Sequence, residues 1–155
     1  MDDKEENALN DIKEYGCHVL SILEEDNLPG FSYSIGIEKS EGEPEVIVYG
    51  LKPEIRQYLV NEYNHRIKAG ERFIPGRFYS GFLGDFDVTF IEVSEQHYRE
   101  HFGWANWLYH GNEFKVLQMI WPTTTGVWPW DAETSDDYNW AQPILNDTGS
   151  LTKIT

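Results

Sequence analysis

The sequence has little of what secreted and membrane proteins require. It contains one cysteine, Cys17, among 155 residues, so no disulfide can form within the chain. Its apolar runs fall far short of the roughly 20 residues that a membrane-spanning helix needs. Residues 1–16 are acidic and carry no apolar stretch of the kind found in a signal peptide. These absences predict a cytoplasmic protein that is neither secreted nor inserted in a membrane.

Basic residues are also scarce. Lysine and arginine total 12 against 27 aspartates and glutamates, which gives a formal net charge of −15. The acids gather toward the ends: residues 1–45 carry 13 acids and 3 bases, residues 46–120 carry 9 and 8, and residues 121–155 carry 5 and 1. Nucleic acids and anionic membranes are disfavoured as partners, because phosphate contacts need clustered cations. A basic protein partner would be attracted, although such a charge can also serve solubility alone.

Motifs of the common catalytic sites are missing. The chain has no P-loop, no dinucleotide-binding G-x-G-x-x-G and no G-x-S-x-G nucleophile elbow. His97-x-x-x-His101 has the i, i+4 spacing of zinc ligands, with Glu100 or His110 as a third ligand. A zinc protease has glutamate after the first histidine, and Tyr98 stands there. Two surface histidines on an aromatic helix are the favoured interpretation, and we expect no metal, no cofactor and no catalytic residue.

Two other groups of reactive side chains are weak candidates. Adjacent residues on a strand point to opposite faces, so Cys17 and His18 would not meet as a thiolate–imidazole pair. A buried, unreactive thiol is the favoured interpretation of Cys17. The carboxylates available for acid–base chemistry lie near the ends of predicted strands, where acids are common: Glu45, Asp85, Asp87 and Glu92.

Hydrophobic patterns predict a mixture of strands and helices. Apolar runs and alternations indicate five strands, over residues 17–23, 31–37, 45–49, 86–93 and 114–121. A helix is predicted over residues 53–69, with proline at its first position, and shorter helices over 8–15 and within 96–110. The charged loop 38–44 and the polar segment after residue 130 are predicted to be irregular. The glycine-rich segment 71–84 is also predicted to be irregular, with short strands within it as the alternative.

These elements predict an α+β fold, with a mainly antiparallel curved sheet or partly open barrel and two or three helices packed on it. No repeat or linker divides the chain. Residues 1–155 are therefore expected to form a single domain, with a frayed N-terminus over about 1–7 and a loose tail over about 146–155. The strand from Phe114 to Trp121 is expected to lie in the core and to lead into a rigid loop that ends at Trp130.

Short motifs of glycine, proline and aromatic residues occur along most of the chain. They are Tyr15-Gly16-x-His18-Val19, Pro29-x-Phe31-x-Tyr33-x-Ile35-Gly36, Pro44-Glu45-x-x-x-x-Gly50-Leu51, Gln118-x-x-Trp121-Pro122, Gly126-x-x-Pro129-Trp130 and Gln142-Pro143. In this order and spacing, over residues 11–145, they resemble the bacterial domain of unknown function 4262 family. The resemblance implies a shared fold and brings no activity with it, and these residue types suit fold determinants.

An acidic, tryptophan-rich segment after the last predicted strand is the first candidate site. Tryptophan and tyrosine dominate the binding energy of protein interfaces, and acids around them select a basic partner. We therefore predict a non-catalytic protein-binding module, for example an inhibitor or immunity protein that neutralises a basic bacterial toxin. The alternative is that the tryptophans fill the core and the acids form a solvated loop. The predicted contact residues are Trp128, Trp130, Asp131, Glu133, Asp136, Asp137, Tyr138 and Trp140.

A pocket in the first half of the chain is the second candidate. Within the predicted strand 31–37, Ser32, Ser34 and Gly36 share one face, and such small residues let a ligand approach the backbone. Together with His18 they would line a site for a flat small molecule such as a flavin, in a binding protein or an enzyme. The alternative for His18 is a core histidine whose ring nitrogens bond to backbone groups.

Overall fold

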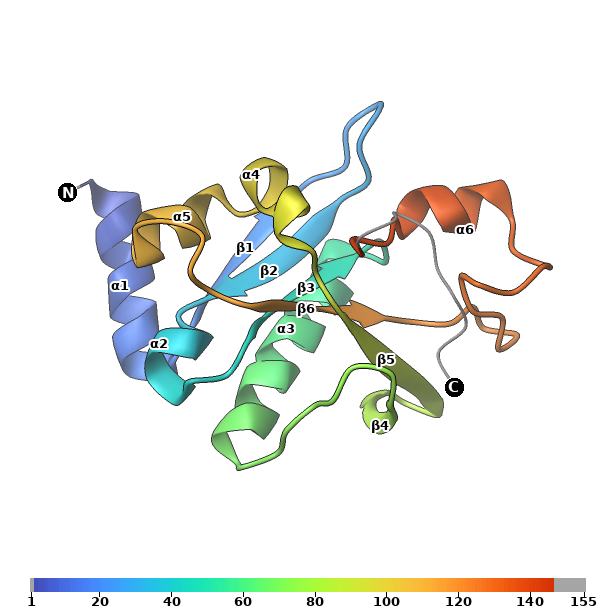
Figure 1. Ribbon diagram of the computed structural model, residues 1–155, viewed down its shortest axis with the longest axis horizontal. Coiled ribbons are helices and arrows are strands. Elements are labelled where there is room, and N and C mark those ends of the chain that lie inside the picture. The colour runs from blue at the N-terminus through green and yellow to red at the C-terminus, as the bar shows by residue number, and fades with distance from the viewer. Residues whose placement is uncertain (1, 147–155) are drawn as a thin grey trace.

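A six-stranded mixed sheet forms the centre of the molecule, in the order β1-β2-β3-β6-β5-β4 (Figure 1). The computed structural model describes residues 2–146, without the side chains of residues 99 and 100. Since β1 and β4 lie at the two edges, the sheet is open, and the predicted α+β class with a curved open sheet is confirmed. The strands are β1 His18–Ile22, β2 Phe31–Ile35, β3 Glu45–Tyr49, β4 Phe78–Leu83, β5 Phe86–Glu92 and β6 Val116–Ile120.

Among the strands of residues 2–146, only the central pair is parallel. β1, β2 and β3 follow one another through short connections and pair antiparallel, as predicted. β3 and β6 run parallel, with Ile47 beside Gln118, because helix α3 (Pro53–Lys68) and the β4–β5 hairpin intervene before the chain returns to the centre. Both central strands are buried along their whole length, which confirms the segment leading to Trp121 as a core element.

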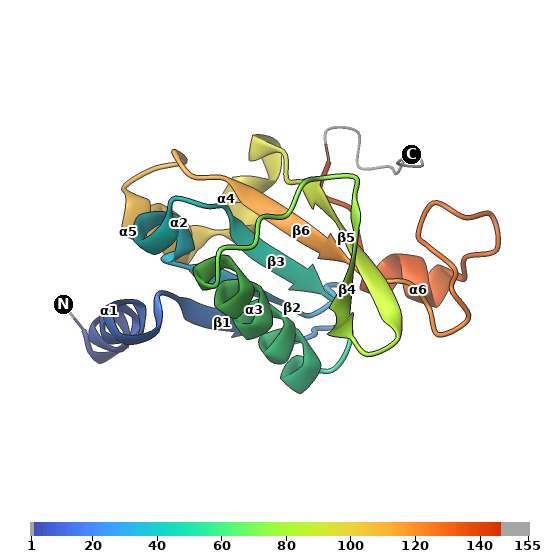
Figure 2. The same ribbon diagram turned by 90° about the horizontal axis from the view of Figure 1, so that it is seen from below.

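Helix α3 covers one face of the sheet (Figure 2). It starts with proline at its first position and ends one residue before the expected residue 69. Each fully buried apolar side chain contributes about 1.5–3 kcal/mol, so this layer is a main source of stability. The hydrophobic core between α3 and the sheet contains Leu59, Val60, Tyr63 and Ile67 from the helix and Val46, Val48, Leu117 and Met119 from the central strands.

Shorter helices cover the opposite face (Figure 1). They are α1 Asp3–Tyr15, the 3-10 helix η1 Glu95–His97, α4 Tyr98–His101 and α5 Gly103–Tyr109. Their apolar side chains bury Tyr33, Ile35 and Ile47 of the sheet beneath Ile12 and Phe102. This arrangement includes the short helices predicted within residues 96–110. None of the helices within residues 2–146 has the length and apolar character needed to cross a membrane.

The first helix begins earlier than the sequence suggested. We expected a helix over 8–15, but α1 already begins at Asp3, because Asp2 and Glu5 form a reciprocal capping box. Three acids in the first turn add favourable interactions with the helix dipole. Of the expected loose tail over about 146–155, residues 147–155 lie outside the described part of the chain.

Two short helices occupy segments that were predicted to be irregular. Helix α2, Ile37–Glu41, replaces the end of the predicted strand 31–37 and most of the predicted loop 38–44. The strand stops at Ile35 because Gly36 takes a left-handed conformation with φ 105°. Helix α6, Asp136–Ala141, begins where the Ser135 hydroxyl accepts a hydrogen bond from the Tyr138 amide at 3.2 Å. Helices of five or six residues are too short for a periodic pattern to reveal them.

Hydrogen bonds around Trp121, which belongs to one of the glycine, proline and aromatic motifs, hold the end of β6 in place. The Trp121 indole N–H donates to the Tyr49 carbonyl at 2.7 Å, which ties β6 to the end of β3. The Gln142 side chain accepts from the Trp121 amide at 3.0 Å and donates to its carbonyl at 3.0 Å. Tyr138 also donates to that carbonyl, at 2.7 Å. These residues therefore act as fold determinants, as the resemblance implied.

Candidate functional site

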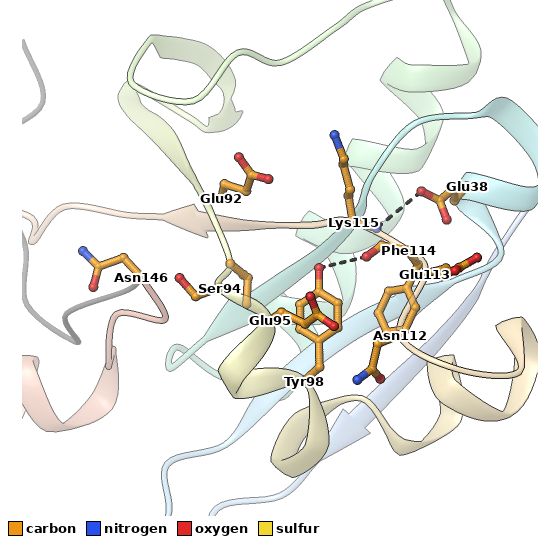
Figure 3. A pocket seen from close by; sticks show the side chains of 11 residues that line it. Glu38, Glu92, Ser94, Glu95, Tyr98, Asn112, Glu113, Phe114, Lys115 and Asn146 are labelled. Carbon is orange, nitrogen blue, oxygen red and sulfur yellow. Dashed lines mark hydrogen bonds between the residues drawn. The ribbon is translucent and has the colours of Figure 1, made fainter.

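An acidic groove lies at the end of the sheet where β5 finishes and β6 begins (Figure 3). Its volume is about 870 Å³, within the range typical of ligand pockets. We call it the acidic groove throughout. Its lining residues are Glu38, Glu92, Val93, Ser94, Glu95, Tyr98, Asn112, Glu113, Phe114, Lys115 and Asn146.

Four separate elements bring the carboxylates of the groove together. Glu92 is the last residue of β5, Glu95 opens η1, Glu113 precedes β6 and Glu38 lies in the first turn of α2 (Figure 3). The antiparallel pairing of Glu92 with Leu117 places the end of β5 beside the start of β6. The Lys115 amide donates to Glu38 Oε1 at 3.3 Å and fixes that side chain. The other three glutamates are exposed.

The charge of the groove is strongly one-sided. Four carboxylates face one ammonium group, that of Lys115. The ion pairs formed within the described residues join Glu71 to Arg66 and Glu43 to Arg72, and the imidazole of His18 contacts Asp11. None of these contacts involves a carboxylate of the groove. A concave surface lined by charges of one sign focuses the field and attracts the opposite charge. The groove is therefore suited to lysine or arginine side chains.

Two aromatic residues in the lining of the groove, Tyr98 and Phe114, are largely buried beneath it. The rings of Tyr98 and Phe114 stack with centroids 4.7 Å apart, and the Tyr98 hydroxyl donates to the Phe114 carbonyl at 2.9 Å. Asn112 and Asn146 add amide groups at the rim. Within residues 2–146 no group of three or more histidine, cysteine or acidic side chains has the geometry of a metal site. Carboxylates above an apolar floor are the arrangement that binds the aliphatic stem and charged end of a basic side chain.

A buried carboxylate, that of Glu45, supports the groove from below. It accepts hydrogen bonds from the amides of Gly36, Ile37 and Glu38, each at 3.1 Å, and from the Ser34 hydroxyl at 2.8 Å. The Tyr109 hydroxyl is a fifth donor. The carboxylate thereby holds the first turn of α2, which carries Glu38. Burial raises the pKa of Glu45 to about 7, although the bonds from Tyr109, the Glu38 amide, Ser34 and the Ile37 amide act to lower it.

This buried carboxylate makes stability depend on pH. Folding raises the pKa of Glu45 from 4.5 to about 7, so the folded state holds the proton more tightly than the unfolded state. The resulting stabilisation is complete below about pH 4.5 and is lost as the pH rises through about 7. Urea unfolding at several pH values should show the advantage of the wild type over Glu45→Gln shrinking across this range. A difference that stays constant with pH would contradict this assignment.

The predicted acidic aromatic surface is divided between core and solvent. Tyr138 is buried against Trp121, with ring centroids 5.2 Å apart. Trp128 and Trp130 are half-buried, stack on each other at 5.2 Å and pack on a small cluster of isoleucines. Trp140 is 42% exposed. The tryptophans therefore combine partial core packing with exposed edges.

The acids of that segment have local structural roles. Asp131 accepts a hydrogen bond from the Trp128 amide at 2.8 Å and closes the turn between them. Asp136 and Asp137 lie in the first turn of α6, where negative charge stabilises a helix. They are exposed, as is Glu133. The segment stays a predicted partner surface, and it is separate from the acidic groove, with which it shares no lining residue.

The second predicted site is not assembled. Ser32 and Ser34 are fully buried beneath α3, where Ser32 accepts from Arg56 and Ser34 donates to Glu45. His18 pairs with Ile35 across the strands, so it lies on the opposite face of the sheet from Ser34. Gly36 is packed against Ile12. The four residues therefore line no common cavity in the described part of the chain.

The histidine and cysteine candidates have contacts or burial that explain them without a reactive site. His18 Nδ1 lies 2.7 Å from Asp11 Oδ2, a side-chain partner that differs from the backbone partners of the core-histidine alternative. His101 Nδ1 bonds to the His97 carbonyl at 2.9 Å and its Nε2 bonds to Tyr49, so neither ring nitrogen is left for a metal. Burial raises the pKa of the Cys17 thiol to about 12, which makes it unreactive at neutral pH, as expected.

Sequence reasoning missed the acidic groove. Glu92 is among the carboxylates named for acid–base chemistry, whereas Glu38, Glu95 and Glu113 belong to no predicted site. The available signal was that acids lie at the ends of two predicted strands, 86–93 and 114–121, which would approach each other if the strands paired antiparallel. The contribution of α2 carried no such signal, because that segment was predicted to be a loop.

Comparison with known proteins identifies a lineage. Residues 11–135 match the profile of a family described as a domain of unknown function (DUF4262). No curated protein and no solved structure matches the chain significantly. The matched segment contains most of the acidic groove and all of the motifs up to Trp130.

Proposed function

The chain belongs to the DUF4262 family, whose description assigns no activity, and we propose from its geometry that it is a non-catalytic module that binds a basic segment of another protein. The observation that carries the proposal is the acidic groove, with four carboxylates, one lysine and an aromatic floor. The net charge of −15 adds long-range attraction for a basic partner. The narrower form of the proposal is a cytoplasmic inhibitor or immunity protein that neutralises a basic bacterial toxin.

The mode of binding follows from the shape and chemistry of the groove. A lysine or arginine side chain entering it lays its aliphatic stem on Phe114 and Tyr98 and places its charge among Glu92, Glu95 and Glu113. Because these three carboxylates are exposed in the free protein, they lose little hydration before the partner arrives. Charge complementarity of this kind mainly sets the association rate and the choice of partner.

Neutralising the groove should weaken binding to a basic peptide. We expect Glu92→Gln/Glu95→Gln/Glu113→Gln to bind a deca-arginine peptide about tenfold more weakly than the wild type at 0.15 M salt, where charges farther apart than about 8 Å are screened. The matched control is Asp3→Asn/Glu6→Gln/Glu14→Gln on exposed positions of α1, which changes the net charge from −15 by the same three units. The affinities are measured by isothermal titration calorimetry.

The control separates a site from a general charge effect. The α1 variant should change the affinity by less than about twofold, because its carboxylates surround no concavity. Equal losses in the two variants would contradict the groove as the binding site. Circular dichroism melts of both variants establish that they remain folded.

The proposal of an inhibitor or immunity protein requires a test in cells. If the protein is an immunity protein, a gene for a basic toxin lies beside its own, and coexpression of the two restores the growth of cells that the toxin alone arrests. The absence of any such neighbour, together with no binding partner in pull-down experiments, would remove this form of the proposal.

A further inference from the structure

A second cavity lies on the other side of the molecule, where the first turn of α3 meets the β1–β2 hairpin and α6. Its volume is about 350 Å³, enough for a small organic molecule. Its walls are mainly apolar and include Leu23, Pro29, Leu51, Pro53 and Trp140. Arg56 and Glu24 are the charged residues of its lining. None of these residues lines the acidic groove, so the two sites are independent.

Arg56 is the unusual feature of this cavity, because it is a buried cation without a carboxylate partner. It is 3% exposed, and within residues 2–146 no carboxylate lies within 4.0 Å of its guanidinium group. It is held by neutral oxygens: Nε donates to Ser32 Oγ at 3.2 Å, and Nη2 donates to the Ile22 carbonyl at 3.3 Å. Nη1 donates to the carbonyls of Leu51, at 3.0 Å, and Gly50, at 3.4 Å.

The bonding of the guanidinium is incomplete. A guanidinium has five N–H groups, and these four bonds use four of them, so one N–H on Nη2 has no acceptor among the described residues. Burial lowers the pKa of Arg56, while the nearby carboxylates of Glu24 and Glu54 raise it without contacting it. A buried charge whose direct contacts are all neutral dipoles gains from an ion of opposite sign that reaches it.

We propose that this cavity binds a small carboxylate that carries an apolar group. One carboxylate oxygen accepts a hydrogen bond from the remaining N–H of Arg56 Nη2, and the apolar part packs between Leu23, Pro29 and Trp140. Because both groups are charged, this hydrogen bond is about twice as strong as one between neutral groups. Two sources share this chemistry: a free small-molecule acid and the C-terminal residue of a peptide.

The test compares a carboxylate with its uncharged counterpart. The ¹⁵N-labelled protein is titrated with N-acetyl-leucine and with N-acetyl-leucinamide, and amide shifts are recorded by NMR. We expect saturable binding of the acid, with shifts centred on Gly30, Leu51 and the Trp140 indole, and affinity for the amide at least about tenfold lower. Equal affinities, or no saturable binding of the acid, would overturn the proposal.

A hexanoate titration separates the two sources. Hexanoate that binds as tightly as N-acetyl-leucine indicates a site for free acids, because the peptide group adds nothing. Tighter binding of N-acetyl-leucine indicates a site for a peptide C-terminus. Both results support the shared carboxylate chemistry, and failure of both acids to saturate the site overturns it.

Variants at the rim avoid the risk that a change at Arg56 unfolds the protein. Leu23 is 67% exposed and lines the cavity, so Leu23→Glu adds a negative charge there and should lower the affinity for N-acetyl-leucine at least about threefold. The matched control is Leu28→Glu in the same hairpin, since Leu28 is 61% exposed and lines no part of the cavity. Glu24→Gln removes a carboxylate from the lining and should raise the affinity. Equal effects of Leu23→Glu and Leu28→Glu would place the ligand elsewhere.

Discussion

Glu45→Ala should lower the free energy of unfolding by about 3–5 kcal/mol at pH 6, one of the two largest single-residue effects we expect. The substitution removes the acceptor of five hydrogen bonds and leaves the donors without a partner. Four of those donors come from residues 34–38, at the turn from β2 into α2. A buried donor that loses its acceptor costs about 1–3 kcal/mol, so the loss well exceeds that of an ordinary hydrogen bond.

The effect of Glu45→Ala also has a local component. Helix α2 has five residues and is too short to be stable alone, so its first turn depends on the carboxylate. Hydrogen exchange of the Ser40 and Gly42 amides, which bond to the Gly36 and Glu38 carbonyls at 2.9 Å, should therefore accelerate more than the global loss of stability explains. Urea unfolding at pH 6 gives the global value.

A matched variant for Glu45→Ala is Tyr109→Phe, which removes one of the five donors and keeps the ring. It should cost only about 1 kcal/mol, since the carboxylate retains four bonds. If Glu45→Ala cost no more than Tyr109→Phe, Glu45 would not be the centre of this network.

Gly50→Ala should cost about 2–5 kcal/mol, for two separate reasons. Gly50 has φ 68°, a left-handed conformation that costs a residue with a side chain about 1–2 kcal/mol. An added Cβ would also lie 2.7 Å from Trp121 Cζ2 and 3.0 Å from the Ala141 carbonyl oxygen. The Trp121 ring cannot move away easily, because its indole N–H is bonded to the Tyr49 carbonyl at 2.7 Å. Overpacking of this kind costs about 1–3 kcal/mol more.

Gly42→Ala isolates the conformational part of that cost. Gly42 has a similar φ of 73°, but an added Cβ would meet nothing within 4 Å. Its substitution should therefore cost about 1 kcal/mol. Thermal and urea melts of the two variants measure the difference, and equal costs would contradict the steric role of Trp121.

The elements that sequence predicted well are those whose pattern is local. Helix α3 shows its start in Pro53, and the apolar residues Leu59, Tyr63 and Ile67 mark part of its buried face in the sequence. The apolar residues Ile55 and Tyr58 share that spacing but are exposed, because the sheet does not cover the whole stripe. The strands β3 and β6 are continuous apolar runs that the fold buries on both faces. Tyr138 is predicted to contact a partner but is buried, because an aromatic residue in a polar segment can face either the core or a partner.

The elements that sequence missed depend on distant residues. Helix α2 is capped by Glu45, which follows the helix in sequence and reaches it only through the pairing of β2 with β3. The acidic groove needs the antiparallel pairing of β5 with β6 and the position of α2 beside them. The expected pocket at Ser32 and Ser34 failed because the small face of β2 is the face that α3 covers.

The most direct test of the central claim is an NMR titration of the wild-type protein with deca-arginine at 0.15 M salt. The claim is that the acidic groove, and not the overall charge, receives a basic segment. The amides of Glu92, Glu95, Asn112 and Glu113 should show the largest shifts and saturate together. Shifts as large on α1, or centred on residues 131–140, would contradict it.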